Sequence, residues 1–195
     1  MKKLFAAYYD AFMNPLEKRL ITSWRKDLLK HAKGSVIEIG AGTGVNFPLY
    51  EHCDEVIAIE PNQHMIKKAI ERKKQTSIPI SIYETKAEKL PFPDHHFDTV
   101  VVTLVLCSVD EPSKVLLEIM RVLKPNGKVL LLEHVKMDHP IFSKFQTMFT
   151  PVWKQLCDGC HLNRKTEKYM KEAGFSFLAK QSYLSGFAVS IIATK

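Results

Sequence analysis

The chain has 195 residues, of which 46% are hydrophobic and 25% are charged, and its formal net charge is +7 at pH 7. This length and composition suit one globular domain whose core is large enough to fold without disulfides or structural metals. No apolar run reaches the roughly 18 residues of a membrane-spanning helix, and polar residues interrupt the N-terminal stretch before a signal peptide could form. These features favour a cytoplasmic protein with reduced thiols, while the positive charge leaves peripheral contact with an anionic membrane open.

Apolar β-branched runs alternate with helical patterns along most of the chain. We predict helices at 45–52, 62–74 and 112–123 and strands at 35–39, 55–59, 79–83, 97–103, 127–133 and 187–194. Such alternation produces a parallel sheet with helices on both faces, which is an α/β fold. We treat residues 1–195 as one domain, with an N-terminal helical cap at 1–33 and a substrate-cap insertion at 135–163. Aromatic residues at helical spacing in both segments are expected mostly to pack in the core and partly to line an apolar acceptor pocket.

Residues 36–44, with the sequence VIEIGAGTG, combine a strand with a glycine-rich turn. Glycine at alternate positions lets the backbone adopt positive φ and approach a ligand closely. A dinucleotide-binding fingerprint needs its third glycine where this chain has Val45, and a phosphate-binding P-loop needs a lysine followed by serine or threonine after the last glycine. A ligand held through phosphate is therefore disfavoured, and a dinucleotide-binding oxidoreductase becomes a minor alternative.

An acid follows the next predicted strand. Glu60 stands about 20 residues after Gly40, which is the spacing at which a carboxylate meets a ribose diol in doubly wound folds. A carboxylate accepts two hydroxyl hydrogen bonds at such a position, and its charge strengthens both. The alternative interpretation of Glu60 is a surface acid at a strand end.

The spacing E-x-G-x-G-x-G from Glu38 to Gly44 resembles motif I of the seven-stranded S-adenosylmethionine (SAM) dependent methyltransferases of the type 11 group. Residues 87–92 and 97–102 resemble the adenine-edge loop and the fourth strand of the same family. The resemblance implies a Rossmann-like, mostly parallel seven-stranded sheet whose last strand is antiparallel. It also implies SAM as cofactor and S-adenosylhomocysteine (SAH) as its product.

The same resemblance implies which residues contact the cofactor. They are Glu38, Gly40, Ala41, Gly42, Gly44, Asn46, Glu60, Pro61, Met65, Ala87, Glu88 and Leu104. Relatives direct the acid at the position of Glu38 toward the ammonium group of the cofactor or toward the glycine-loop amides, and an ion pair with a nearby lysine is the alternative. Lys86 stands where many relatives carry aspartate, which weakens the assignment of adenine recognition to Glu88.

Five further segments narrow the resemblance. Residues 100–109, 122–125, 132–135, 151–153 and 158–164 resemble the methyltransferase-like 7 group, which comprises thiol S-methyltransferases of animal membranes and bacterial relatives. This group implies a small, apolar acceptor such as a thiol. A quinone precursor, a phospholipid amine and a non-catalytic SAM-binding domain remain the alternatives. We expect no hydrophobic N-terminal anchor of the kind found in the animal proteins, and the oligomeric state stays open.

The acceptor side offers several candidate residues. His134, at the end of the fifth predicted strand, is the first candidate for a general base, and Asp158 and His161 follow it. Cys107 or Ser108 is expected to face the acceptor. Because methyl transfer from a sulfonium is an in-line displacement that depends mainly on positioning, a dedicated base is not required. Structural roles for His134 as a hydrogen-bonding residue and for Cys107 as a core residue are therefore open alternatives.

Two other kinds of ligand are not expected. Of the four cysteines, only Cys157 and Cys160 have the spacing of metal ligands, and one CxxC motif is half of a zinc site. His161 could add a third ligand, but no fourth residue is suitably spaced, so we predict no metal. The basic residues at 67–74 lack interleaved aromatics, which favours a solvated helix face over a nucleic-acid-binding surface.

Overall fold

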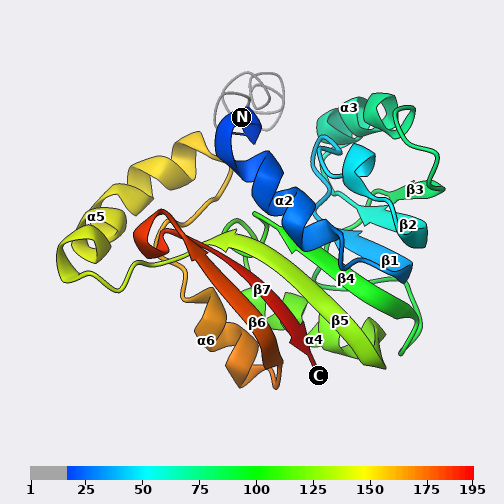
Figure 1. Ribbon diagram of the computed structural model, residues 1–195. Coiled ribbons are helices and arrows are strands. Elements are labelled where there is room, and N and C mark those ends of the chain that lie inside the picture. The colour runs from blue at the N-terminus through cyan, green and yellow to red at the C-terminus, as the bar shows by residue number, and fades with distance from the viewer. Residues whose placement is uncertain (1–16) are drawn as a thin grey trace.

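The computed structural model describes residues 17–195, in which seven strands form one sheet in the order β3-β2-β1-β4-β5-β7-β6 (Figure 1). Strands β1 to β5 pair in parallel, whereas β7 runs antiparallel to both β5 and β6. The bounds are Gly34–Ile39 for β1, Cys53–Ile59 for β2, Ile80–Tyr83 for β3, Phe97–Thr103 for β4, Leu123–His134 for β5, Ser176–Tyr183 for β6 and Ala188–Thr194 for β7. The predicted Rossmann-like sheet with an antiparallel last strand is confirmed.

The predicted strands end within one residue of the observed ones, and the larger differences lie elsewhere. β5 begins at Leu123 rather than at 127, because Leu123 already pairs with Phe97 before the register jumps to Thr99 and Lys128. The turn residues between Leu123 and Lys128 therefore form an irregularity within the strand. β6 is not marked by the hydrophobic pattern, since it is an edge strand whose residues are mostly exposed.

The helices are α2 (Thr22–Leu29), α3 (Gln63–Lys73), α4 (Pro112–Val122), α5 (Pro140–Leu156) and α6 (Thr166–Glu172), with short turns η1 (Glu17–Ile21), η2 (Phe47–Leu49) and η3 (Leu184–Gly186). The helices predicted at 62–74 and 112–123 are confirmed as α3 and α4. The helix predicted at 45–52 is wrong, because only the single 3-10 turn η2 forms there. Pro48 cannot donate a helical hydrogen bond, and Tyr50 already has extended backbone angles that lead into β2.

Alternate residues of the central strands pack into two cores, one on each face of the sheet. Ile37 and Ile39 of β1 lie with residues of α4 and α6 in one core, whereas Val36 lies with residues of α2 and α3 in the other. This alternation follows from the two-residue period of side chains along a strand. Helices therefore cover both faces, as predicted, and the described part of the N-terminal segment, α2, packs against the sheet.

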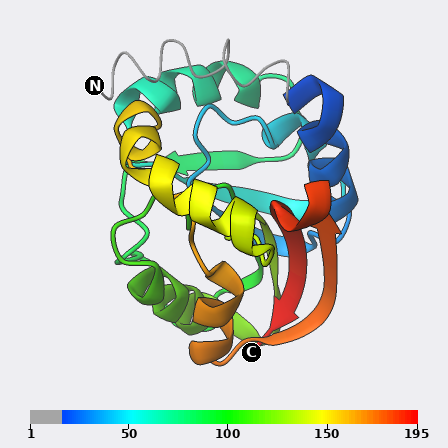
Figure 2. The same ribbon diagram turned by 90° about the vertical axis from the view of Figure 1, so that its left-hand side faces the viewer.

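Helix α5 occupies a different place from the other helices. It extends beyond the sheet in Figure 1, and in Figure 2, turned by 90°, it crosses in front of the strands. Four of its large apolar side chains, at Phe142, Phe145, Met148 and Phe149, are exposed. The prediction that most aromatic residues of this segment pack in the core is therefore wrong for these residues, because α5 turns this face away from the sheet. The N-terminal aromatics up to residue 16 lie outside the described residues.

Candidate active site

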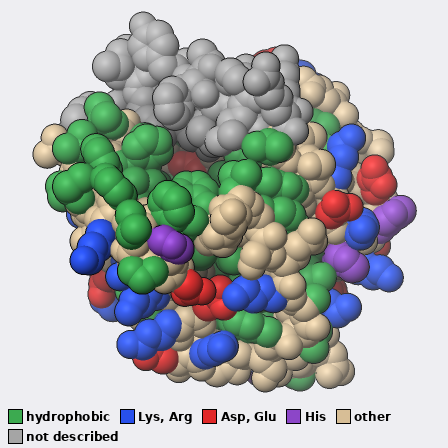
Figure 3. All heavy atoms as spheres, turned by 60° about the vertical axis from the view of Figure 1, so that its left-hand side comes forward, with side chains coloured by type: hydrophobic (Ala, Val, Ile, Leu, Met, Phe, Trp, Pro, Cys, Tyr) green, Lys and Arg blue, Asp and Glu red, His purple; other side chains and the backbone are tan. Residues whose placement is uncertain are grey.

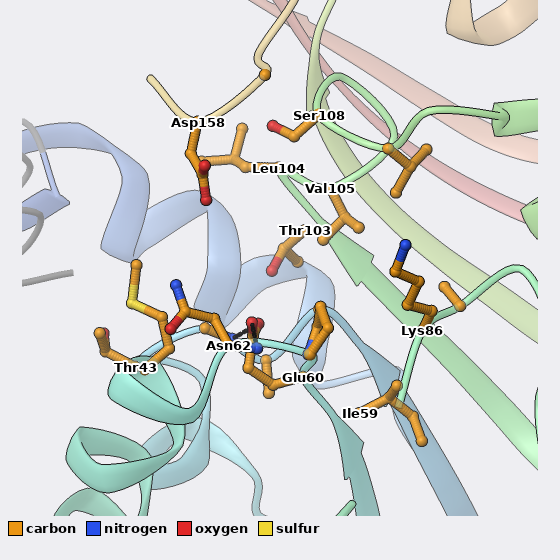
Figure 4. A pocket seen from close by; sticks show the side chains of 18 of the residues that line it. Thr43, Ile59, Glu60, Asn62, Lys86, Thr103, Leu104, Val105, Ser108 and Asp158 are labelled. Atoms are coloured by element: carbon orange, nitrogen blue, oxygen red, sulfur yellow. Dashed lines mark hydrogen bonds between the residues drawn. The ribbon is translucent and has the colours of Figure 1, made fainter. Parts of the chain in front are cut away.

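A cavity of about 440 Å³ opens where the carboxyl ends of β1, β2 and β4 meet (Figure 4). The order of the strands reverses between β1 and β4, and open α/β sheets bind ligands at such switch points. Its wall combines residues 40–43 and 45, 59–62 and 65, 86–88, 103–105, 108–110 and 157–159, together with Arg25. Its size lies within the range of small-molecule sites.

The glycine loop brings bare backbone to this cavity. Gly40 and Gly42 have φ values of +66° and +57°, which residues with a Cβ rarely adopt. A Cβ on Gly40 would lie 2.5 Å from Cγ2 of Val105, whereas a Cβ on Gly42 would meet no atom within 4 Å. Gly40 is therefore required by its conformation and by its neighbour, and Gly42 leaves room inside the cavity.

Glu60 connects the glycine loop with the turn between β2 and α3. Its Oε2 accepts a hydrogen bond from the backbone N–H of Gly42 at 2.9 Å, and its Oε1 accepts one from the backbone N–H of Asn62 at 2.8 Å. The side chain is buried and lies in the cavity wall. The spacing between Gly40 and Glu60 thus correctly predicts that Glu60 lies next to the glycine loop, and the Glu60 carboxylate stabilises this loop by its hydrogen bond to Gly42.

A buried polar network lies beneath the loop. Glu38 accepts hydrogen bonds from Nδ2 of Asn46 and from the hydroxyl of Tyr50, both at 2.8 Å. Nη1 of Arg25 donates to Oδ1 of Asn46 at 3.0 Å and to Oγ1 of Thr103 at 2.7 Å. Burial raises the pKa of Glu38 to about 7, although these partners favour the charged form. Among the described residues, the hydrogen bonds of the Glu38 carboxylate thus come from Asn46 and Tyr50, and not from the glycine-loop amides or a lysine.

The segment after β4 forms the opposite wall. Leu104 has φ +57°, a conformation that costs a residue with a side chain roughly 1–3 kcal/mol. The backbone N–H groups of Val105 and Leu106 donate to the carboxylate of Glu133 at the end of β5, which fixes this turn. Burial raises the pKa of Glu133 to about 7. Val105, Ser108 and Val109 then line the cavity.

The structure separates the predicted residues into those that line the cavity and those behind it. The lining set comprises Gly40, Ala41, Gly42, Glu60, Pro61, Met65, Ala87, Glu88, Leu104, Ser108 and Asp158. Glu38, Gly44 and Asn46 lie behind the glycine loop, and Cys107, His134 and His161 do not line the cavity either. Sequence reasoning missed Arg25, because it comes from a distant helix with no motif.

Three sulfur and imidazole side chains meet behind the acceptor side of the cavity. Nε2 of His134 lies 3.0 Å from Sγ of Cys160, and Sγ of Cys107 completes the group. The hydrogen bond with Cys107, and then that with His134, lower the pKa of Cys160 to about 4. Burial lowers the pKa of His134, but the contact with Cys160 outweighs it and the net shift is upward. The ring of His134, the first candidate base, thus contacts the thiol of Cys160, and His134 does not line the cavity.

The antiparallel seventh strand, the switch-point cavity, the glycine loop without phosphate-binding residues and the acid at Glu60 together define a class I SAM-dependent methyltransferase. Residues 37–131 match the family model described as a methyltransferase domain. The chain is 33% identical over 186 residues to thiol S-methyltransferase TMT1B of Homo sapiens, covering 89% of this chain and 76% of that protein. It is also 27% identical over 209 residues to the ubiquinone/menaquinone biosynthesis C-methyltransferase UbiE of Pseudomonas fluorescens, covering 93% of this chain and 82% of that protein.

Solved structures agree with this fold. A SAM-dependent methyltransferase from Thermotoga maritima, described as a possible histamine N-methyltransferase, superposes with a TM-score of 0.73 at 23% identity, covering 99% of this chain and 97% of that one. A methyltransferase from Bacillus halodurans superposes with a TM-score of 0.75 at 17% identity, covering 89% and 99%. The chain belongs to the SAM-dependent methyltransferase family and is an enzyme of that class. Among its described residues, no helix is both long and apolar enough to cross a membrane.

Proposed function

We propose that this methyltransferase acts on a small, apolar acceptor, and that the acceptor is a thiol. The supporting observation is the wall that faces the glycine loop, which Leu104, Val105 and Val109 make apolar and to which Ser108 and Asp158 add polar groups. Two relatives more than 30% identical, TMT1B and TMT1A of Homo sapiens, are thiol S-methyltransferases. A thiolate needs no base at the moment of transfer, and a net positive protein favours the approach of an anion.

The residues of the cavity fit SAM as cofactor. Glu60 would accept hydrogen bonds from the ribose hydroxyls, and the backbone around Gly42 would contact the methionine part, where no Cβ intrudes. Pro61 and Met65 would pack against the adenosine, with Ala87 and Glu88 near its base edge. SAM supplies an electrophilic methyl group on a sulfonium, and the protein holds it in line with the acceptor. Glu38 and Asn46 would support the loop from below rather than contact the cofactor.

Asp158 is the candidate for assisting an acceptor that arrives protonated. Asp158 lines the cavity together with Leu104 and Ser108 (Figure 4), and a Cβ on the neighbouring Gly159 would lie 3.2 Å from the carbonyl oxygen of Ser108. A carboxylate at this place can hold the proton of a thiol while the methyl group is transferred. His134 and Cys107 lie behind the wall and would position it.

A panel of acceptors tests the proposed substrate. The purified protein is incubated with SAM carrying a labelled methyl group and with alkyl thiols, quinol precursors or phosphatidylethanolamine in separate reactions. We expect label in thiols, and a Glu60→Gln variant should lose this transfer in step with its affinity for SAH. Label in quinols or phosphatidylethanolamine but not in thiols would refute the thiol assignment. These two acceptors are included because the chain is similar to UbiE and to the phosphatidylethanolamine N-methyltransferase of Cereibacter sphaeroides.

We also propose that α5 touches a membrane surface from which an apolar acceptor can enter. Its exposed apolar residues include Ile141, Phe142, Phe145, Met148, Phe149, Val152 and Leu156, and Figure 3 shows hydrophobic side chains gathered on this side with basic ones at their border. A helix with such a face and a basic surround lies on anionic bilayers. Co-sedimentation with vesicles containing phosphatidylserine tests this contact, and equal sedimentation of a Phe145→Glu, Phe149→Glu variant would refute it.

A further inference from the structure

The Cys107, His134 and Cys160 side chains come from three separate segments of the chain. Cys107 follows β4, His134 ends β5, and Cys160 lies between α5 and α6. One potential ligand atom from each, two Sγ atoms and a ring nitrogen, lie within 4.8 Å of one another. Both cysteines are buried, and the structure contains no disulfide between them. The fold therefore brings three potential metal ligands close together.

The spacing of these atoms suits a tetrahedral metal ion. With Zn–S near 2.3 Å and Zn–N near 2.0–2.1 Å, two ligand atoms of a tetrahedral zinc lie about 3.5–3.8 Å apart. Nε2 of His134 and Sγ of Cys160 are 3.0 Å apart, and no separation in the group exceeds 4.8 Å. Side-chain movements of about 1 Å or less would therefore produce the coordination geometry.

The chemistry of the donors selects the kind of metal. Two thiolates and one imidazole are ligands for Zn²⁺ and similar ions, whereas Mg²⁺ and Ca²⁺ prefer oxygen. The carboxylate of Glu133 lies next to this group and interacts with Cys107. Its Oε2 and Nδ1 of His134 are buried without a hydrogen-bond partner among the described residues. A divalent cation would balance the acidic groups that are concentrated here.

The grouping differs from the one that the sequence suggests. Cys157 and His161 are the neighbours of Cys160 along the chain, but neither joins the cluster. Nδ1 of His161 instead lies 3.3 Å from the carbonyl oxygen of Cys107 and 3.2 Å from Nη2 of Arg164. The structure thus replaces an incomplete local motif with a three-ligand set assembled from distant segments.

We propose that Cys107, His134 and Cys160 form a Cys₂His site for a thiophilic divalent cation, with Zn²⁺ as the first candidate. By binding all three side chains, the cation would hold the segment after α5 against the ends of β4 and β5. Ser108 and Gly159, which line the cavity, directly follow or precede two of the ligands. The site would therefore hold the acceptor wall in place, and its fourth coordination position would be left to water or another small ligand.

Metal content provides a test that does not depend on activity. The full chain is purified in reductant without chelator, and its zinc is measured by mass spectrometry. We expect roughly one equivalent per chain, as a single site requires. After chelation, Co²⁺ added to the apoprotein should produce thiolate-to-cobalt charge-transfer absorption. Cys107→Ser, Cys160→Ser and His134→Ala should each weaken metal binding at least tenfold.

Matched controls separate a metal site from loss of folding. Cys53→Ser and Cys157→Ser remove cysteines outside the cluster and should keep the full metal content. SAH binding, measured for every variant, shows whether the cofactor half is still folded. A wild-type chain that carries no zinc and shows no charge-transfer band with Co²⁺ would overturn the proposal. Loss of metal in Cys157→Ser would also overturn it, since the ligands would then follow the CxxC motif.

Discussion

The substitution Gly42→Ala separates the cost of an unusual backbone conformation from the space that a cofactor needs. Gly42 has φ +57°, and a Cβ on it would enter the cavity without meeting any protein atom within 4 Å. A left-handed conformation costs a non-glycine residue roughly 1–2 kcal/mol. We therefore expect Gly42→Ala to remain folded, with its free energy of unfolding reduced by about this amount.

The effect on cofactor binding should be larger than the effect on stability. The new methyl group would occupy the place where we expect the methionine part of SAM to contact the backbone. We predict at least a tenfold weaker binding of SAH, which corresponds to about 1.4 kcal/mol. Calorimetric titration with SAH measures the affinity, and urea denaturation measures the free energy of unfolding.

Two other glycines provide the controls. Gly186 has φ +88° and open space around its Cβ position, but it lies in η3 and does not line the cavity. Gly186→Ala should lose similar stability and keep its affinity for SAH. Gly40→Ala adds a clash with Val105 at 2.5 Å, so overpacking of about 1–3 kcal/mol raises its total cost to roughly 2–5 kcal/mol. If Gly42→Ala binds SAH as tightly as Gly186→Ala does, the cofactor does not contact this loop as proposed.

Three further predictions concern acids of the site. Glu60→Gln leaves one acceptor oxygen for the N–H groups of Gly42 and Asn62; calorimetry should show SAH affinity reduced by about 1.5–3 kcal/mol, and unchanged affinity would argue against the ribose contact. The pKa of Glu38 is raised from 4.5 to about 7. Between pH 4.5 and about 7, Glu38 is therefore protonated in the folded state but ionised in the unfolded state, and the free energy of unfolding falls as the pH rises through this window. Urea denaturation across that window should show a shallower fall in Glu38→Gln, and an unchanged slope would exclude Glu38 as the titrating group. Asp158→Asn should lower kcat for thiols at least tenfold while the Kd for SAH stays within about twofold, and an equal kcat would remove Asp158 from the reaction.

The sequence alone was sufficient for the features that depend on neighbouring residues. Strand limits follow from β-branched apolar runs that are buried on both faces, as in β1 and β4. The glycine loop was predictable because positive φ is a conformation that individual glycine residues favour. Glu60 was predictable because it stands directly after β2. The local approach failed at 45–52, where Pro48 and the side chains of Asn46 and Tyr50 favour a buried turn over a helix.

Only the tertiary structure decided which distant residues meet. Arg25 reaches Asn46 and Thr103 because α2 packs over the sheet, and Glu133 binds the turn after β4 because β4 and β5 are neighbours. The same packing joins Cys160 to His134 rather than to its nearest cysteine along the chain. Local spacing reports backbone preferences and ligand loops, whereas contacts across the sheet depend on strand order and helix packing, which no short stretch of residues encodes.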